Sequence, residues 1–409
     1  MCTITKKNQI YFLFFLINIS FLYPTDFRFI YNEGDNYRIV SEVFEEVSEN
    51  DQIIYSTEIL NRISVAIGES DGKSGEIEAI YQISERAMGG GSYQWSSEDS
   101  AVFRRDDRGL YSIIPENESL PSVRNIPRFP ERELSPGDTW NFFAEEVHDL
   151  YPFFFIDYRL HIPFRVFYNY EGSFEENGKI YDRILINYNI YYEEDPLITV
   201  YEHPEWGKVF PRKIVGTFNQ EYVWNRDAGR PENVEDRFEY KYFLSTGDTY
   251  TFTGVSYGKV IGAEEMDRSH LVKEINEELE QAGFDDIHAT SEDEGVKISI
   301  EDIRFLPNSP ILEESEIFKL ERISGILLRY RDRDLLISGH TARFGTEESS
   351  QVLSEERAAA VASYLLGKKI REESEIVTRG FGSLEPIGDN STIEGQKMNR
   401  RVEITILEN

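Results

Sequence analysis

Histidine, cysteine and carboxylate side chains carry out most metal and acid–base chemistry, and their spacing here supports neither. The chain of 409 residues has 6 histidines and 1 cysteine. The histidines are His148, His161, His203, His270, His288 and His340. None of them stands in an HxxxH or HxH pattern, so the sequence does not support a zinc site. The 75 acidic residues are so frequent that chance pairs are certain, and no acid–base pair can be assigned.

Sequence motifs of nucleophilic and nucleotide-dependent enzymes are absent as well. There is no GxSxG, no Walker A loop and no GxGxxG after a predicted strand. The lone Cys2 excludes an intramolecular disulfide and a cysteine-based zinc site. We therefore predict a non-enzymatic protein with no catalytic residue, no metal site and no cofactor.

The composition favours a folded, acidic protein of more than one domain. Hydrophobic residues make up 40% of the chain and aromatic residues 13%, which is enough for a packed core. A length of 409 residues exceeds that of a usual single domain. The net charge of -32 opposes binding to a phosphate backbone, so we expect no nucleic-acid partner.

Residues 1–25 have the pattern of an export signal. Lys6 and Lys7 precede an apolar run at residues 10–23, which is shorter than the about 20 residues that a membrane-spanning helix needs. A signal peptide is the first interpretation, and an uncleaved N-terminal anchor is the alternative. Both predict an exported protein.

Residues 27–262 have the pattern of an antiparallel β-rich region. Segments such as 53–67 and 183–192 alternate or run apolar over the length of a strand. Turn signals such as Asn177-Gly178 separate these segments. Alternation of this kind is typical of sheets with one face toward water, so we predict a sandwich or a partly open barrel.

Two segments interrupt this pattern. Residues 120–140 are rich in proline and end near Trp140, which indicates a long connection that could divide the region into two halves. Residues 151–156 form an aromatic cluster. The cluster is explained either by core packing or by the wall of a cavity for an apolar ligand.

The C-terminal third changes to a mixed helical pattern. Residues 264–294 predict a helix–strand connector, with Ser269 as the N-cap and Gly283 just past the helix end. Beyond it, strands and helices alternate. The predicted segments are strands at 296–303, 335–338, 375–378 and from 401, with helices at 315–331 and up to 367. This order predicts an α/β sandwich with its helices on one face of the sheet, and a multidomain α+β protein as a whole.

Several sequence motifs stand in order along residues 295–409. They are IRFLPNSPIL, GHT, LSEERAAAV, RGFGSLEPIGDN and NRRVEI. In this order they resemble the OmpA-like peptidoglycan-binding domain family. The resemblance implies an envelope protein of the periplasm, cell wall or outer membrane that holds the peptidoglycan stem peptide without covalent bonds. GHTA combined with a β-rich acidic front half also resembles envelope proteins of spirochaetes, although less closely.

The resemblance implies which residues form a binding site. In the family an Asp meets the ammonium group of a diamino acid and an Arg meets its carboxylate, which an arginine can contact in bidentate fashion. The Arg of the LS..RA motif is Arg357, and the usual Asp is replaced by Ala342. The implied site residues are Thr341, Ala342, Ser350, Arg357, Asn399 and Arg400.

Because Ala342 has no carboxylate, the sequence does not determine which ligand the site binds. An ammonium group without a partner is costly in a closed site, so Glu347 or Glu348 could replace the Asp. A second hypothesis is a different diamino acid, such as the ornithine that the spirochaete resemblance implies. A third is that peptidoglycan binding is lost and the domain is a scaffold for protein interactions. Arg357 would then form only a surface ion pair.

The sequence thus predicts a non-enzymatic envelope protein whose C-terminal domain contacts peptidoglycan, with altered or weakened recognition. The alternative is an envelope carrier or sensor, with an apolar ligand or an envelope protein bound at the β-rich region.

Overall fold

The computed structural model describes residues 24–113, 120–194, 209–262, 266–305 and 311–408. The predicted signal segment therefore lies outside the described residues, apart from its last two. Within the described part of the chain, no helix is long and apolar enough to cross a membrane.

The N-terminal region is one long antiparallel sheet. Its strands are β1 (Asn36–Glu49), β2 (Gln52–Ser70), β3 (Ser74–Ala87), β4 (Tyr93–Asp106), β5 (Tyr111–Ile113), β6 (Val123–Arg124), β7 (Thr139–Asp149), β8 (Arg159–Glu176), β9 (Lys179–Glu193), β10 (Pro211–Asn225), β11 (Arg230–Leu244) and β12 (Thr249–Gly262). Their order in space is β5-β4-β3-β2-β1-β12-β11-β10-β9-β8-β7-β6. Neighbours in this order are successive strands of the chain, except that β1 pairs with β12 and so joins the two halves of the region. The successive strands β5 and β6 lie at opposite edges.

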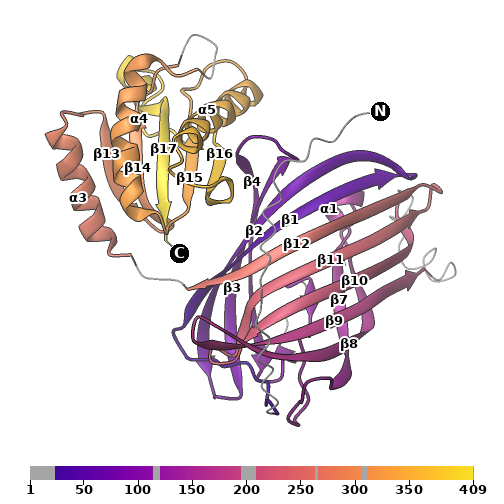
Figure 1. Ribbon diagram of the computed structural model, residues 1–409. Helices are drawn as coiled ribbons and strands as arrows, with labels where there is room; N and C mark the ends of the chain where they lie inside the picture. The colour runs from indigo at the N-terminus through magenta and orange to yellow at the C-terminus, as the bar shows by residue number, and fades with distance from the viewer. Residues whose placement is uncertain (1–23, 114–119, 195–208, 263–265, 306–310, 409) are drawn as a thin grey trace, which may run out of the picture.

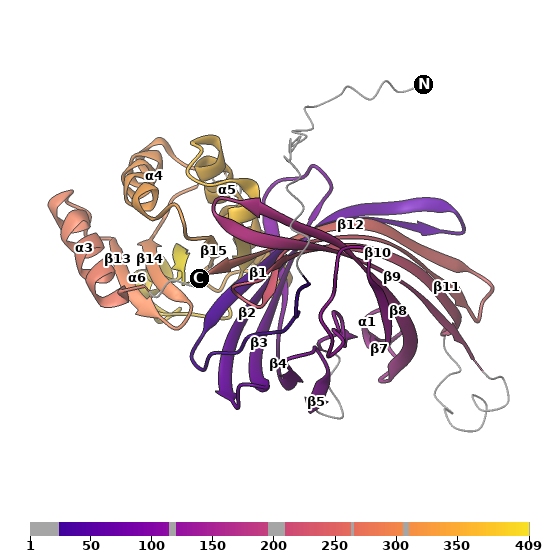
Figure 2. The same cartoon turned by 60° about the horizontal axis from the view of Figure 1, so that its bottom comes forward.

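The sheet curls into an open trough (Figure 2), and it is not closed. The predicted sandwich is not confirmed, since these strands pair into a single continuous sheet. Alternation along β8 shows that one face of the sheet is buried: Ile162, Phe164 and Val166 are buried and alternate with exposed residues.

Aromatic side chains fill the trough. Tyr188 stacks between Phe164 and Phe218, with 4.5 Å between ring centroids on each side. The segment before β1 also packs here, with Phe27 stacked on Phe129 at 5.2 Å.

The aromatic cluster at residues 151–156 is divided between core and solvent. It includes a short helix, α1 (Tyr151–Phe154). Phe154 packs against the core at 6.0 Å from the ring of Tyr242, whereas the side chain of Phe155 is 68% exposed. The interpretation of this cluster as a cavity wall is therefore wrong for Phe155, because an exposed ring encloses no ligand.

The C-terminal part is a second sheet with helices packed on it (Figure 1). Its elements are α3 (Arg268–Gln281), β13 (Ile287–Glu292), β14 (Gly295–Glu301), α4 (Glu314–Leu327), a 3-10 turn (Leu328–Tyr330), β15 (Leu335–Gly339), α5 (Glu347–Gly367), a second 3-10 turn (Glu373–Glu375), β16 (Ile376–Gly380), α6 (Ile393–Asn399) and β17 (Arg401–Leu407). The strand order is β13-β14-β17-β15-β16, and only β15 and β16 are parallel. The predicted order of helices and strands is confirmed, except that α6 was not predicted.

The two sheets meet at an interface. β16 pairs in parallel with β4, through Val377 opposite Tyr93 and Thr378 opposite Gln94. A small apolar cluster surrounds this pairing. Its buried members are Val40, Leu60, Tyr93, Leu336, Val377 and Leu407.

Charged side chains flank the apolar cluster. The carboxylate of Asp334, which precedes β15, accepts hydrogen bonds from Arg38 at 2.8 Å and from Arg62 at 2.9 Å. Both arginine side chains are buried, so this shared carboxylate neutralises charge at the interface.

Candidate functional site

The candidate site is built around the loop that joins β15 to α5. Gly339 ends β15, and a Cβ at this position would lie 2.0 Å from the carbonyl oxygen of Ser354, so only glycine lets the strand pack closely against α5. Thr346 caps the helix, because its hydroxyl accepts a hydrogen bond from the backbone N–H of Ser349 at 3.1 Å. The loop is therefore fixed at both ends.

Buried polar contacts hold the first part of the loop. The backbone N–H of His340 donates to the carbonyl of Arg401, and that of Thr341 to the carbonyl of Gly382. The His340 ring stacks on Phe381 at 4.9 Å. Next to these fixed residues, the Oγ1 of Thr341 is buried without a hydrogen-bond partner among the described residues.

Glu403 supplies a buried negative charge beneath the loop. Its Oε2 lies 3.3 Å from Nε2 of His340, within ion-pair distance but outside hydrogen-bond geometry. Arg401 donates a hydrogen bond to its Oε1 at 2.7 Å. Burial by itself would raise the pKa of Glu403, but His340 and Arg401 lower it to about 2. Glu403 therefore stays ionised, and it ties the loop to β17.

Arg357 lies on α5 as a partly buried cation. Its guanidinium carbon is 5.0 Å from the ring centroid of Phe305, where cation–π attraction is effective. Its Nε is buried without a hydrogen-bond partner, and no carboxylate among the described residues forms an ion pair with it. Burial lowers the pKa of Arg357, and the charge of Arg400 lowers it further. The predicted surface ion pair of Arg357 is thus not seen in the described part of the chain.

Arg400 lies near Arg357 but has a partner. Its Nη2 donates to Oδ1 of Asp302 at 2.7 Å. The two arginines therefore differ: Arg400 is neutralised within the chain, whereas the positive charge of Arg357 remains available to an anion.

Asn399 is fully buried, and its side chain forms hydrogen bonds within the chain. Its Oδ1 accepts from the backbone N–H groups of Ile387 and Gly388, both at 2.8 Å. Its Nδ2 donates to the carbonyl of Gly388 and to Oδ1 of Asn390. All of its donors and two acceptor positions are used, so Asn399 orders the loop at residues 387–390.

The other predicted residues are placed less directly. Ser350 is buried, and its hydroxyl donates to the carbonyl of Phe344 at 3.3 Å. Ala342 is partly exposed, and Glu347 and Glu348 are exposed in the first turn of α5. The structure thus brings Arg357 and Arg400 together, and it uses Ser350 and Asn399 to shape loops.

Sequence reasoning missed Phe305, Asp302 and Glu403. Phe305 stands in the motif IRFLPNSPIL, and nothing local indicates that its ring lies against Arg357. Glu403 stands in a strand that alternates apolar and polar residues, so its burial could be found only from the pairing of β17 between β14 and β15. Within the described residues, no group of three or more His, Cys, Asp or Glu side chains could hold a metal ion.

Comparison with known proteins places residues 304–400 in a family. They match the model described as the OmpA family. Outer membrane porin F of Pseudomonas aeruginosa is 30% identical over 105 residues, which is 26% of this chain and 30% of that protein. Peptidoglycan-binding protein ArfA of Mycobacterium bovis is 39% identical over 87 residues, 21% of this chain and 26% of that protein. The chain thus spans less than a third of the length of both relatives.

One solved structure is similar in sequence to part of this chain. An outer membrane protein from Borrelia burgdorferi B31 is 36% identical, and the match covers 30% of this chain and 96% of that one with a TM-score of 0.25. The family match spans α4, β15, α5, β16 and α6. It therefore includes the GHT loop and Arg357. The C-terminal part of this chain therefore contains an OmpA family domain at residues 304–400.

Proposed function

We propose that this chain is a non-enzymatic protein of the cell envelope whose OmpA family domain contacts the peptidoglycan stem peptide. The proposal rests on the family match and on relatives that are named as outer membrane or peptidoglycan-binding proteins. Export to the periplasm, next to the cell wall or outer membrane, follows from the same relatives. In this proposal residues 27–262 and 295–409 act as separate domains, and residues 264–294 connect them, with α3 and β13 packed on the C-terminal sheet.

The single observation that carries the proposal is the unpaired charge of Arg357. A guanidinium withdrawn from water without a carboxylate is unfavourable, and binding an anionic ligand group removes that cost. The planar fork of an arginine matches a carboxylate in bidentate fashion, which gives direction as well as energy. We infer that Arg357 binds a carboxylate of the stem peptide.

The ammonium side of the ligand has a weaker site. Ala342 has no carboxylate to offer, and the acidic residues of the same loop and helix are Glu347 and Glu348. Both are exposed, so a contact with an ammonium group would be screened by water and worth about 1 kcal/mol or less. Recognition in this proposal is therefore weaker than in a domain that retains the Asp.

Co-sedimentation of the full chain with purified sacculi tests the proposal. We expect the wild-type chain to pellet with the sacculi and Arg357→Ala to remain mostly in the supernatant. Arg322→Ala is the matched control, since Arg322 is an exposed arginine of the same domain that also lies over a ring, that of Phe318 at 5.6 Å. Failure of the wild-type chain to pellet, or equal pelleting of Arg357→Ala, would refute the proposal.

A further inference from the structure

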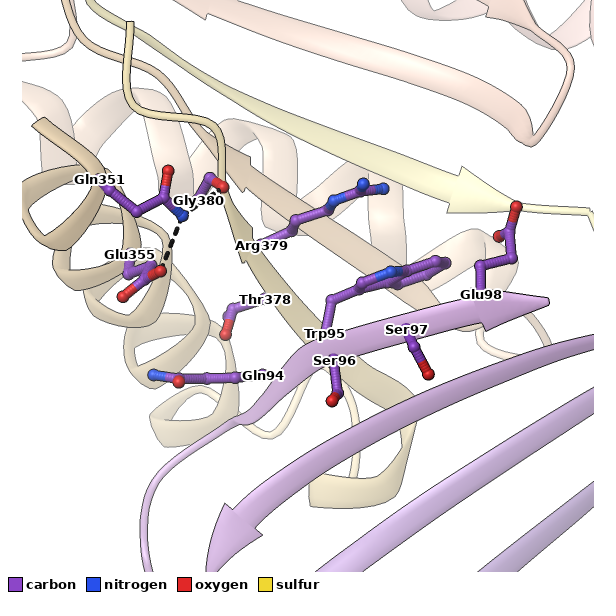
Figure 3. Close-up of a pocket in the computed structure, with 10 residues that line it drawn as sticks. All are labelled: Gln94, Trp95, Ser96, Ser97, Glu98, Gln351, Glu355, Thr378, Arg379 and Gly380. Atoms are coloured by element: carbon purple, nitrogen blue, oxygen red, sulfur yellow. Dashed lines mark hydrogen bonds between the residues drawn. The ribbon is translucent and has the colours of Figure 1, made fainter. Parts of the chain in front are cut away.

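A polar cleft opens at the junction of the two sheets, on the side of α5 that faces β4. Its volume is about 620 Å³. Its walls are residues 94–98 of β4, Gln351 and Glu355 of α5, and residues 378–380 of β16 (Figure 3). Neither Arg357 nor Arg400 lines it. The cleft adjoins the site described above, because the Phe381 ring contacts both Arg379 and His340.

The edges of β4 and β16 meet at this cleft, and they pair over only a short part of their length. β4 and β16 run parallel and pair only at Tyr93–Gln94 and Val377–Thr378. On the side away from β3, the described strands leave β4 unpaired from Trp95 to Phe103, and β5 pairs with it at Arg104 and Arg105. Backbone N–H and C=O groups on such an edge are a template for an added strand.

An irregularity in β4 helps to open the cleft. Trp95 and Ser97 face consecutive residues of β3, so Ser96 is an extra residue on β4 at this point. A bulge of this kind bends a strand and turns its side chains. We attribute to it the divergence of β4 from β16 beyond the paired residues.

Arg379 provides a positive charge in the cleft, within electrostatic range of Glu294. Its guanidinium carbon lies 5.0 Å from the ring centroid of Trp95 and 4.6 Å from that of Phe381. In the described part of the chain it has no ion pair and no hydrogen-bond partner. Stacking on aromatic faces orders a guanidinium and leaves its N–H edges free for a carboxylate. Figure 3 shows Arg379 beside Trp95 in the middle of the cleft.

The acidic groups of the cleft limit how much negative charge a ligand of Arg379 can carry. Glu98 lies at one end and accepts a hydrogen bond from Gln82, and Glu355 lies at the other end and accepts one from Gln351. These two carboxylates, and Glu294, which interacts electrostatically with Arg379 and Glu98, would repel a ligand with several negative charges. The cleft therefore admits at most one ligand carboxylate, placed directly on Arg379, beside neutral hydrogen-bonding groups.

We propose that this cleft binds the C-terminal end of an extended peptide, which adds to the edges of β4 and β16 and places its terminal carboxylate on Arg379. The backbone of the peptide would supply the neutral donors and acceptors that the two edges lack. The proposal does not depend on peptidoglycan contact.

Fluorescence polarisation with the full chain tests this site. The probe is a fluorescein-labelled peptide of alternating valine and threonine with a free C-terminal carboxylate. A second peptide, with the C-terminal carboxylate replaced by an amide, tests the role of Arg379. A third peptide, in which alternate backbone amides are N-methylated, tests pairing with the strand edges. We expect the amide, and Arg379→Ala with the acid, to bind roughly tenfold or more weakly, because a charge-assisted hydrogen bond is lost. We expect no binding of the N-methylated peptide.

Controls separate this site from a general effect of charge and from peptidoglycan contact. Arg322→Ala should bind the acid peptide like the wild type, and Arg379→Ala should still pellet with sacculi. The site is overturned if the acid peptide does not bind, if acid and amide bind equally, or if N-methylation has no effect. Displacement of the bound peptide by chitobiose would also overturn it, in favour of a saccharide site.

Discussion

In our proposal, Arg357 is the residue whose unpaired charge binds the ligand. Its position could be predicted from the LS..RA motif, because a helix with apolar residues at 358, 361, 362 and 365 leaves residue 357 at its flank. Its contact with Phe305 could not be predicted, since the two residues are far apart in sequence and meet only through tertiary packing. The motif also identifies Asn399. Only the structure shows that the side chain of Asn399 forms its hydrogen bonds with a neighbouring loop, so that it is not free to bind a ligand.

A change at Ala342 tests whether the loop faces the ligand. We expect Ala342→Asp to raise the affinity for sacculi about tenfold, because a charge-assisted contact with an ammonium group contributes about 1.5 kcal/mol. The measurement is co-sedimentation over a range of sacculus concentrations. Ser363→Asp adds the same charge at an exposed position on α5 and should change nothing. An unchanged or lower affinity of Ala342→Asp would contradict the placement of the ammonium group at this loop.

Local sequence patterns predict the helices and strands of the C-terminal domain more closely than they predict the strand pairing of the N-terminal sheet. The helical period of the apolar residues predicts α5, and the final alternation predicts β17. The helix α6 was missed because IEGQKMN is short, has no apolar stripe and contains Gly395. Pairing of β1 with β12, and of β4 with β16, joins residues remote in sequence. Such pairings depend on the register of whole strands, which no short segment encodes.

At the interface between the sheets, Asp334 should be the most sensitive residue. Replacing it by alanine leaves the buried Arg38 and Arg62 without their shared carboxylate, so we expect the free energy of unfolding to fall by about 3 kcal/mol or more. Urea denaturation measures this loss. Asp285→Ala, at an exposed aspartate of the same domain, should cost about 0.5 kcal/mol or less. Equal effects of the two substitutions would show that the interface does not depend on Asp334.

On the curved sheet, Glu45 should make stability depend on pH. Burial, and then the charge of Glu85, raises its pKa to about 7. A carboxyl whose pKa is raised on folding holds its proton more tightly in the folded state, so stability falls as the pH rises from about 4.5 to 7. We expect Glu45→Gln to be more stable than the wild type at pH 8 by about 2 kcal/mol, with no difference at pH 4. Thermal unfolding at both pH values measures this.

Glu46 provides the control for this prediction. It is the next residue along β1, it points to the other side of the sheet and its side chain is exposed. Glu46→Gln should leave the pH dependence of stability unchanged. A pH dependence that persists in Glu45→Gln would assign the effect to other carboxyls, such as Asp236, whose pKa burial and Glu146 raise to about 6.

At the scale of the whole molecule, the composition and the alternation along the chain predicted an acidic protein with a β-rich front and a mixed C-terminal domain. The closure of the sheet could not be predicted, because alternating strands suit a sandwich, a barrel or a trough equally well. The structure shows an open trough joined edge to edge with the OmpA family domain through β4 and β16. In our proposal this domain holds peptidoglycan, and the sheet is fixed beside it by the interface at Asp334.

The most direct test of this account is the affinity of the full chain for a soluble stem peptide, measured by isothermal titration calorimetry. The peptide carries a diamino acid with a free side-chain carboxylate, and its partner peptide has that carboxylate amidated. We predict that the acid peptide binds, and that amidation or Arg357→Ala weakens binding roughly tenfold or more, because the bidentate contact is lost. Equal affinity for the two peptides, or an undiminished affinity in Arg357→Ala, would contradict the claim that Arg357 binds a carboxylate of peptidoglycan.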